Sequence, residues 1–574
     1  MREEKAILNV RWFKKNPYTY SMILIVVLAT LFRCILLAFN WPTTNSDEGN
    51  LGIAGMRIAF HGELPIFFYG QAYMGPVESY LAAPLFRLFG PSLFTLRFSL
   101  ILMYAGFLIG TYFLVRLLYT ERYALASVLL LSFGSPEVIL RLIKAVGEYP
   151  EMTVAAPFIL LIATKLALTA PTRERPSPMV PWKRYMLFAL LGVIFGVILW
   201  VDLIILPFVV TASIFLLIFC WREARSWPLL CIIGGLLLGL FPMIYYNISL
   251  LSDMKVFLEQ NSVSVLLHMH GVSDGVMAEK HLTLLHQLLG SIMIALPLAT
   301  GAYPSCPDQD WILFGHPTSA TIGCSIASLT WGIVFLLLMA LATILAIVAV
   351  WRHRAIFRSQ DAEKRELFIL KSARVMVLLS ACLTFGQYIT STHGAVYPVT
   401  SARYLSCLLD TMPAIFWPVW VGAGRLFKAI NWKQRALGIV SSILLAILFV
   451  TFVRGTIGTI RDVPDAYRNY QQRDRLVNHL LSIGATRIYS EYWTCNDLIF
   501  HSKEQIICSV LYPNLRPGLT RYRPYQAMVD QAPVKAYIFP KSAEHLKALE
   551  KKMQGTNYKK EIFEDRYVIY YIPQ

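Results

Sequence analysis

Two acidic residues, Asp47 and Glu48, directly follow the first apolar run of the chain. Apolar residues recur at helical spacing after them, and Ser46 is a suitable N-cap, so both acids are expected in the first turn of a helix. The helix dipole there favours an ionised carboxylate, which can serve as a general base. Acids are also common at ordinary helix starts, and the spacing alone leaves both interpretations open.

A second charged group lies in the segment RLIKAVGEYPE, which holds two bases and two acids: Arg141, Lys144, Glu148 and Glu151. This segment is either a solvated tether or the second wall of a site that faces Asp47. Arg97, and Arg403 followed by Tyr404, stand at the ends of other apolar runs. Cations at one interfacial level suit a lipid phosphate, whereas a single arginine can also snorkel to the membrane surface.

The elements that must position these residues are set by an apolar composition. Of 574 residues, 56% are hydrophobic and 15% are charged, and the mean hydropathy is +0.53. A soluble protein averages about 25% charged residues. These values exclude a disordered chain, a plain soluble enzyme and a single-pass receptor. The net charge of +17 comes largely from short loops between apolar runs, so it indicates membrane topology and not nucleic acid as a partner.

Eleven runs are long enough to cross a bilayer as helices. They lie near residues 20–40, 93–115, 123–140, 152–170, 185–202, 204–221, 228–250, 326–350, 375–392, 404–424 and 437–454. Basic residues are concentrated before the first run and in the loops 351–374 and 425–435, which places the N-terminus and these loops in the cytoplasm. The odd number of runs then places the C-terminus outside the cytoplasm, with the protein in the inner or plasma membrane.

The predicted fold class is mostly α: a polytopic membrane domain over residues 1–454 and a soluble α/β extracytoplasmic domain over 455–574. Two outer loops, 41–92 and 251–325, are too long for simple connectors. The first is expected to form two amphipathic helices at the membrane interface. In the tail, helices are predicted at 474–483 and 543–553 and strands at 486–490, 505–510, 535–539 and 567–571.

Four of the nine cysteines fall in segments predicted to face outward, where disulfides persist. Cys306 and Cys324 share one outer loop, and Cys495 and Cys508 share the tail domain. We predict that at least one of these two pairs is oxidised. The cysteine spacing shows no zinc-site pattern.

Several short motifs make the chain recognisable over residues 20–165. They are the Asp47-Glu48 pair, Leu64-Pro65, Tyr69-Gly70-Gln71-Ala72-Tyr73-Met74-Gly75-Pro76, Leu88-Phe89-Gly90-Pro91-Ser92 and Arg97-Phe98. The set resembles the GT-C superfamily of membrane glycosyltransferases. The branch it resembles is the protein-mannosyltransferase-like group, with the aminoarabinose transferases and the rhizobial lipopolysaccharide galacturonosyltransferases. The resemblance is weaker at 196–207, 239–247 and 402–405.

This resemblance implies an enzyme that transfers a sugar from a polyprenyl-phosphate donor to a hydroxyl of a lipid, glycan or protein acceptor, with inversion. By the same resemblance Asp47 is the general base, Glu48 is its neighbour, and Glu148 is the second acidic motif. Substrate-binding residues are then expected among Tyr73, Glu78, Arg97, Lys144, Glu151, Arg403 and Tyr404. No organic cofactor is implied, and a divalent cation is left open.

The sequence departs from the aminoarabinose transferases at two places. Asn50 stands where they carry an arginine, and Tyr73-Met74-Gly75-Pro76 stands where they carry Phe-Glu-Lys-Pro. Glu78 is the closest spare acid. These departures leave the identity of the donor and the use of a metal undecided.

Two other function classes compete with the glycosyltransferase. A transporter or flippase of lipid-linked substrates would use intramembrane acids, for which Asp202 and Asp410 are the candidates. Such proteins are typically built from internal repeats, and the sequence shows none. A polymerase or ligase of surface glycans with a different fold is the third interpretation, but that class lacks an Asp-Glu pair after its first span.

Overall fold

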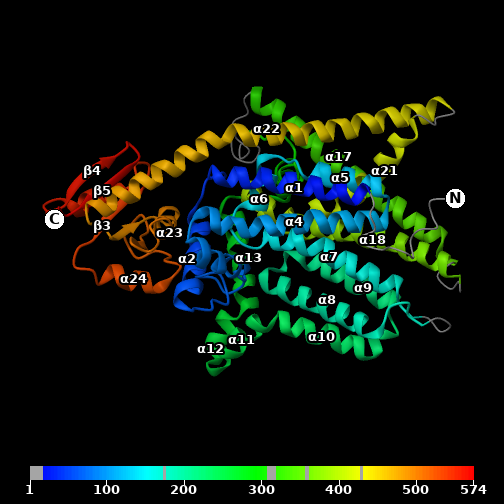
Figure 1. Ribbon diagram of the computed structural model, residues 1–574. Coiled ribbons are helices and arrows are strands. Elements are labelled where there is room, and N and C mark those ends of the chain that lie inside the picture. Colours follow the sequence, from blue (N-terminus) through cyan, green and yellow to red (C-terminus); the bar gives the residue numbers. More distant parts are fainter. Residues whose placement is uncertain (1–16, 172–175, 307–318, 356–360, 427–430, 574) are drawn as a thin grey trace.

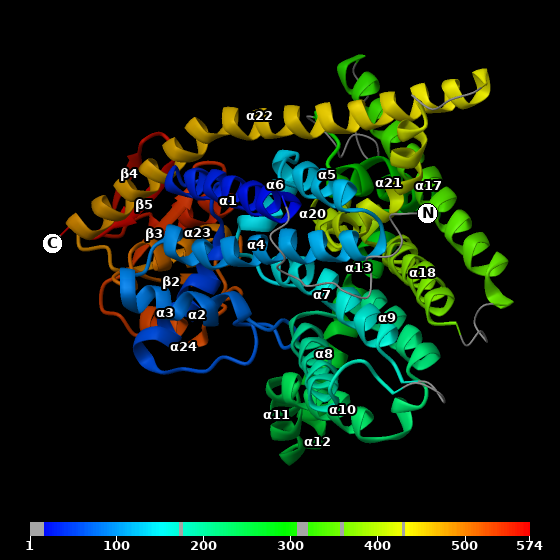
Figure 2. The same ribbon diagram turned by 45° about the vertical axis from the view of Figure 1, so that its right-hand side comes forward.

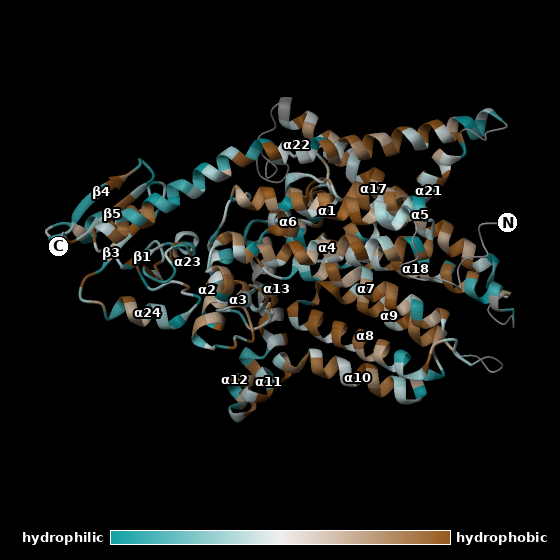
Figure 3. Cartoon of the chain, viewed as in Figure 1, coloured by the Kyte–Doolittle hydropathy of each residue, from teal (hydrophilic) through white to brown (hydrophobic). Residues whose placement is uncertain are grey.

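The computed structural model describes residues 17–171, 176–306, 319–355, 361–426 and 431–573. It shows a bundle of helices with a small sheet domain at one end, formed by the C-terminal part of the chain (Figure 1). Figure 3 shows the same division in composition, because apolar residues dominate the bundle and polar residues dominate the sheet domain. The predicted mostly α fold with a small C-terminal α/β domain is confirmed, with 74% of the structure helical.

Seven helices in the described residues are long and apolar enough to cross a membrane alone. They are α1 (Pro17–Ala38), α4 (Leu93–Leu118), α7 (Tyr149–Leu168), α8 (Pro181–Val201), α17 (Ser319–Arg352), α18 (Ala362–Ile389) and α22 (Trp432–Ser482). The chain is therefore a multi-pass membrane protein.

Three further pairs of helices are long enough only together, and each pair is sharply bent. α5 (Glu121–Leu131) meets α6 (Pro136–Ile143) at an angle of 91°. α10 (Trp227–Gly239) makes an angle of 62° with the segment that consists of α11 (Phe241–Ser249) and the turn that follows it to Ser252. In the third pair, α20 (Pro398–Ser401) and the turn Ala402–Leu405 meet α21 (Leu408–Gly424) at 72°. Proline in the first turn of α6 and α11 has no N–H to continue the preceding helix, which favours the first two breaks.

Every predicted apolar run overlaps one of these elements or the shorter apolar helix Leu203–Phe219, which includes α9 (Leu206–Phe219). If each bent pair crosses the membrane as one span, the described helices form up to ten spans. The predicted number of eleven therefore stays a prediction.

The segment predicted as the first outer loop forms two short helices, α2 (Ser46–His61) and α3 (Val77–Phe89), as expected. α2 does not lie exposed at an interface, because 11 of its 16 residues are buried. It is covered by α23 (Tyr492–His501) of the C-terminal domain. Gly49 and Gly52 permit this contact, since a Cβ atom at these positions would lie 2.6 Å from the Asn496 backbone and 2.5 Å from the Phe500 ring.

The C-terminal domain is a five-stranded sheet in the order β2-β1-β3-β5-β4. The strands are β1 (Arg487–Ser490), β2 (Ile507–Val510), β3 (Ala536–Pro540), β4 (Lys559–Phe563) and β5 (Tyr567–Tyr571). β1 pairs in parallel with β2 and β3, and β5 pairs antiparallel with β3 and β4. The predicted strands match β1, β2, β3 and β5, and the prediction missed β4, α23 and α24 (Arg523–Asp530); the predicted helix 543–553 matches α25 (His545–Met553).

One hydrophobic core joins this domain to the first outer segment. Leu51, Ile53 and Met56 of α2 belong to the same cluster of buried residues as Leu498 and Ile499 of α23. α22 is a second connection, since it continues from the bundle to the sheet domain as a single helix (Figures 1 and 2). Residue 454, the predicted domain boundary, lies inside this helix, and the predicted helix 474–483 is its last part.

The connections α9–α10, α17–α18 and α21–α22 lie at the end of the bundle opposite α2, α3 and the sheet (Figures 1 and 2). They carry basic residues, among them Arg222, Arg225, Arg352, Arg354 and Arg425. This arrangement agrees with the predicted grouping of basic loops on one side of the membrane. The basic residues before Pro17 lie outside the described residues, and the side that this end faces stays a prediction.

Two disulfides are present, Cys306–Cys324 and Cys495–Cys508, so the predicted pairing is confirmed for both pairs. The predicted large outer loop is itself helical, with α12 (Met254–Gln260), α13 (Ser262–Glu279), α14 (Leu284–Leu289), a π-helical turn Gly290–Ala295 and α15 (Leu296–Thr300). The short helix α19 (His393–Val396) packs against α14.

Candidate active site beside the C-terminal domain

Asp47 is the second residue of α2, in the first helical turn, as predicted. The N-cap is Asn45 and not Ser46, because the extended backbone of Asn45 lets its side-chain oxygen accept the Glu48 N–H at 3.1 Å. Asp47 is half-buried. Its Oδ1 accepts a hydrogen bond from the Tyr492 hydroxyl at 2.5 Å.

Tyr492 begins α23, and its hydroxyl in turn accepts a hydrogen bond from Nε of Arg521 at 2.8 Å. Burial raises the pKa of Tyr492, and the nearby Asp47 carboxylate raises it further, so the hydroxyl stays protonated at neutral pH. Neither Tyr492 nor Arg521 was expected from the sequence. Asp47 and Tyr492 are separated by 445 positions, and no local pattern marks such a contact.

Glu48 and Arg97 bind each other and not an open space. Arg97 donates from Nε and from a terminal guanidinium nitrogen to the two carboxylate oxygens of Glu48, at 2.7 and 2.6 Å. The Ala145 N–H also donates to Glu48, at 3.1 Å. Both side chains are fully buried, at 0% exposure. The pair therefore ties α2 to α4 and to the segment after α6.

Lys144 caps the C-terminal end of α6 and is 8% exposed. Burial lowers the pKa of its ammonium to about 8, while Glu48 and Asp47 act in the opposite direction. In the described part of the chain, no carboxylate forms an ion pair with Lys144; of the acids that act on it, Glu48 pairs with Arg97 and Glu137 with Arg141. A buried ammonium close to Asp47 is thus left for an anionic group.

Glu148 precedes α7 with a positive φ of 63°, which is uncommon for a residue with a side chain. It forms a carboxyl–carboxyl hydrogen bond with Asp202, the residue between α8 and the turn Leu203–Ile205. Burial and the charge of Asp202 raise the pKa of Glu148 well above its ordinary value. Asp202 also accepts the Ile204 N–H at 2.8 Å. Two buried carboxyl groups in contact disfavour the state in which both are ionised.

Glu78 and Glu151 are buried near Glu148. Glu78 accepts the Gly147 N–H at 3.2 Å, and burial followed by the charge of Glu151 raises its pKa well above the ordinary value. Neither carboxylate oxygen of Glu151 has a hydrogen-bond partner among the described residues.

Arg403 lies beside this acidic group, in the turn before α21. Its guanidinium lies 5.5 Å from the ring centres of both Tyr149 and Tyr404, and its Nε has no hydrogen-bond partner within the described ranges. The Nε of Arg141 also has no hydrogen-bond partner among the described residues. A terminal nitrogen of Arg141 pairs with Glu137 at 3.1 Å. Arg141 is buried and Arg403 is half-buried. Guanidinium groups with free donors can bind a phosphate.

Tyr73, on the segment between α2 and α3, connects the two parts of the site. Burial raises its pKa, and the charged groups that act on it come from both parts: Glu148, Asp202 and Arg521. The structure thus brings the predicted residues Asp47, Tyr73, Lys144, Glu148, Arg403 and Tyr404 into one region. Glu48 and Arg97 form a buried ion pair next to Lys144. Asp202, Tyr492 and Arg521 are the additional members.

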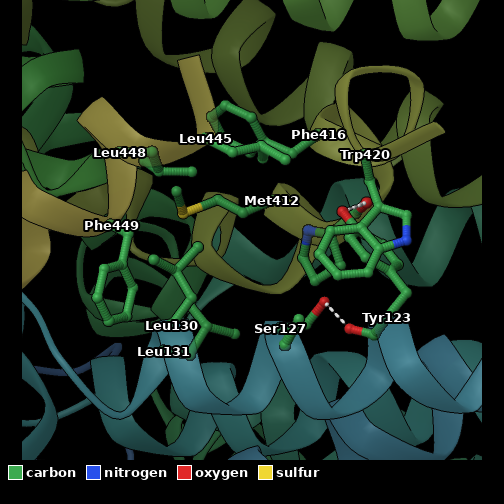
Figure 4. Close-up of a pocket in the computed structure, with 12 residues that line it drawn as sticks. Tyr123, Ser127, Leu130, Leu131, Met412, Phe416, Trp420, Leu445, Leu448 and Phe449 are labelled. Atoms are coloured by element: carbon green, nitrogen blue, oxygen red, sulfur yellow. Dashed lines mark hydrogen bonds between the residues drawn. The ribbon is translucent and has the colours of Figure 1, made fainter. Parts of the chain in front are cut away.

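Two other kinds of feature could bind a ligand: clusters of metal-binding side chains, and cavities. No group of three or more His, Cys, Asp or Glu side chains that could hold a metal ion occurs in the described residues. A cavity of about 170 Å³ lies between α5, α21 and α22, lined by side chains that include Leu131, Met412 and Phe416 (Figure 4). Its lining is almost wholly apolar, which suits hydrocarbon and not a sugar or a phosphate.

No protein-family model matches the sequence, and no curated protein matches it. Among solved structures, the chain is similar to ArnT from Cupriavidus metallidurans bound to undecaprenyl phosphate, with 11% identity and a TM-score of 0.50, over 96% of this chain and 97% of that chain. It is also similar to apo ArnT, with 10% identity and a TM-score of 0.40, over 97% and 98%. The archaeal oligosaccharyltransferase AglB from Archaeoglobus fulgidus matches with 12% identity and a TM-score of 0.45, over 91% and 69%. The likeness to the first structure shows that the fold is the GT-C fold that the motifs indicated.

Proposed function

We propose that this protein is a membrane glycosyltransferase that moves a sugar from a polyprenyl-phosphate donor to a hydroxyl of a lipid, glycan or protein. Two considerations support this: the fold shared with ArnT, whose structure holds undecaprenyl phosphate, and the chemistry of the site. The observation that carries the proposal is the placement of a half-buried carboxylate, Asp47, close to a buried cation that lacks an ion-pair partner in the described residues, Lys144.

In this proposal Asp47 removes the proton from the acceptor hydroxyl. The acceptor oxygen then attacks the anomeric carbon from the face opposite the phosphate, and the bond from that carbon to the phosphate oxygen breaks with inversion. The electron pair of that bond leaves with the lipid phosphate. General-base catalysis of this kind is worth about 10²–10⁴-fold.

The leaving phosphate requires positive charge, because negative charge develops on it as the bond breaks. Lys144 and Arg141, which are buried, and Arg403, which is half-buried, are the cations that we assign to it. Arg403 and Arg141 each have an unpartnered Nε among the described residues, and Lys144 has no ion pair there. Because Glu48 binds Arg97 through both carboxylate oxygens and both residues are fully buried, we assign that pair a structural role and not one in phosphate binding.

Glu148 and Asp202 are assigned to the sugar. A carboxyl pair of this kind offers both a donor and an acceptor to sugar hydroxyls when one of its members is protonated. Tyr73 and Tyr404 bring aromatic rings to the same region. A divalent cation stays open in this scheme, and no step depends on one.

We further propose that the site and the C-terminal domain face away from the cytoplasm, in the inner or plasma membrane. The two disulfides support this orientation, since disulfides persist in oxidising compartments. The basic connections at the opposite end of the bundle support it as well.

The test compares a deletion strain with strains that carry the wild-type chain, Asp47→Asn or Arg403→Gln. Mass spectrometry of surface glycans and glycolipids should show a sugar lost in the deletion strain and restored by the wild-type chain. We expect Asp47→Asn to lower the transfer rate by about 10²–10⁴-fold with little change in donor KM. Arg403→Gln should raise donor KM more than it lowers the transfer rate. Near-full transfer by Asp47→Asn at normal expression would contradict the proposal.

A transporter of lipid-linked substrates is the second candidate, because Asp410 is 2% exposed within α21 and both its carboxyl oxygens lack partners in the described part of the chain. The same strains separate the two functions. A transferase consumes the sugar–phosphate bond of the donor, whereas a transporter leaves the donor intact and changes only its side of the membrane.

A further inference from the structure

The contact between α23 and α2 places residues of the C-terminal domain at Asp47. α23 begins at Tyr492, and its body packs on Gly49 and Gly52, which follow Asp47 along α2. The backbone of Asn496 and the ring of Phe500 occupy the space that a side chain at these glycines would need. The contacts of Asn496 and Phe500 with α2 therefore hold the helix that carries Tyr492.

Arg521 connects the same hydroxyl to the segment between α2 and α3. Its Nε donates to the Tyr492 oxygen at 2.8 Å, and a terminal nitrogen donates to the Gly70 carbonyl at 3.4 Å. The guanidinium also lies 5.1 Å from the ring centre of Phe68 and 5.3 Å from that of Tyr492. Gly70 has a φ of +77°, and a Cβ atom there would lie 2.8 Å from the Arg521 side chain. Arg521 is thus held from several directions.

These contacts define the direction of each hydrogen bond. Because the Tyr492 oxygen accepts from Arg521, its own hydrogen is directed to Oδ1 of Asp47. In the described part of the chain this bond occupies Oδ1 and leaves Oδ2 for an incoming proton. The arrangement is that of a catalytic carboxylate held in one orientation by a donor that is itself oriented by a third group.

We propose that Tyr492 and Arg521 are positioning residues that hold Asp47 in the orientation needed to accept the acceptor proton, so that the active site is complete only when the C-terminal domain is docked. The inference rests on the proposed role of Asp47 as base. The proton goes from the acceptor hydroxyl to Oδ2 of Asp47, while Tyr492 keeps its own proton and touches no reacting atom.

The alternative is that Tyr492 only stabilises the docking of the domain. A matched control separates the two, because the domain contains a second tyrosine–carboxylate bond away from Asp47. The Tyr489 hydroxyl donates to Oδ1 of Asp530 at 2.6 Å. Tyr489→Phe and Tyr492→Phe delete the same atom and the same kind of bond, one from each place.

The experiment uses the full-length chain in detergent, with membranes of the deletion strain as the source of donor and acceptor. Initial transfer rates are measured by mass spectrometry for Tyr492→Phe, Arg521→Gln, Tyr489→Phe, Asp47→Asn and the double variant Asp47→Asn/Tyr492→Phe. Thermal unfolding of each variant is recorded in parallel. The pH dependence of the rate is measured for each active variant.

We expect Tyr492→Phe to lower kcat by about 10- to 100-fold with donor KM nearly unchanged, because a misaligned base slows only the chemical step. The acid limb of its pH–rate profile should move to higher pH, since an ionised carboxylate loses a donor. Arg521→Gln should move the limb in the same direction. Tyr489→Phe should match the wild type, and Tyr492→Phe should cause no further loss when Asp47 is already Asn.

Equal kcat and equal acid limbs for Tyr492→Phe and Tyr489→Phe would overturn the inference, and so would additive losses in the double variant. Either result, together with a large loss for Asp47→Asn, leaves the proposed function in place. Near-full activity of Asp47→Asn is a different result, which refutes the proposed function itself. If Tyr492→Phe unfolds at a lower temperature than Tyr489→Phe, the Arg521→Gln variant decides between positioning and docking. A shift of its acid limb to higher pH supports the inference, and an unchanged limb overturns it.

Discussion

At the scale of single residues, the neighbours of each charged side chain decide whether it can take part in chemistry. In the sequence, Glu48 and Arg97 are as suited to catalysis and phosphate binding as Asp47 and Lys144 are. In the structure they bind each other at 2.6 Å, buried and neutralised. Lys144, by contrast, has no ion pair within the described residues, while two of the carboxylates near it, Glu48 and Glu137, pair with arginines.

Lys144 gives the donor affinity a pH dependence. Its pKa is lowered to about 8 by burial, so the ammonium is charged below pH 8 and loses its charge as the pH rises through that value. We expect donor KM to rise above about pH 8 for the wild type. Lys144→Arg should flatten this rise, since an arginine stays charged. Donor KM is measured as a function of pH, over a range that extends from about two pH units below the pKa of Lys144 to about one and a half pH units above it. A wild-type KM that does not change over this range would contradict the assignment of Lys144 to the phosphate.

Sequence alone could place Asp47 in the first turn of a helix, because N-terminal helix positions follow from local pattern. It could also place Asp202 between two apolar runs. It could not show that Asp202 meets Glu148, or that Tyr492 meets Asp47, because these contacts depend on how distant segments pack. Of the candidate site, sequence therefore supplied most of the charged residues but not their partners.

At the scale of elements, the short helices after the first span were predicted correctly, but the element that packs on them was not. The periodicity of α2 and α3 indicated helices at a membrane interface, and both helices exist. The partner of α2 is another helix, α23, which the sequence prediction missed. Gly49 and Gly52 mark the place where α23 packs on α2. Small residues are frequent in the helices of membrane proteins whatever those helices pack against, so this glycine pair could not identify α23 in advance.

The α2–α23 contact predicts the effect of a single methyl group. In Gly49→Ala the new Cβ would meet the Asn496 backbone at 2.6 Å, so α23 must shift. Overpacking of this kind costs about 1–3 kcal/mol. We expect a lower temperature of thermal unfolding and a lower transfer rate. Gly234→Ala in α10 is the control, since nothing in the described structure lies within 4 Å of its Cβ position, and it should leave both quantities unchanged. Equal behaviour of the two variants would show that the contact is looser than described.

At the scale of the whole molecule, the bundle separates two chemically different ends. The sheet domain, α2 and α3 lie at one end, and the connections α17–α18 and α21–α22 lie at the other (Figures 1 and 2). Composition and run length were enough to predict the class of fold, because a membrane span is a local property of about 20 residues. The bends within three of the predicted runs were missed, since the apolar pattern continues through each break.

The separation of the two ends predicts opposite behaviour of two reporters. A phosphatase reporter fused after Gln574 should be active only outside the cytoplasm. The same reporter inserted after Arg354, in the connection α17–α18, should be inactive, because that connection lies at the opposite end of the bundle. Equal activity at both sites would refute the predicted orientation.

The docking of α23 on α2 has a consequence for the order in which the protein is made. A ribosome releases the chain from its N-terminus, so α2 is synthesised hundreds of residues before the helix that covers it. Until α23 emerges, the buried face of α2 and the carboxylate of Asp47 have no cover from the C-terminal domain. A nascent chain that stops between α22 and α23 would hold every described span and still lack the donor to Asp47, so α23 must be made before the site takes its final form.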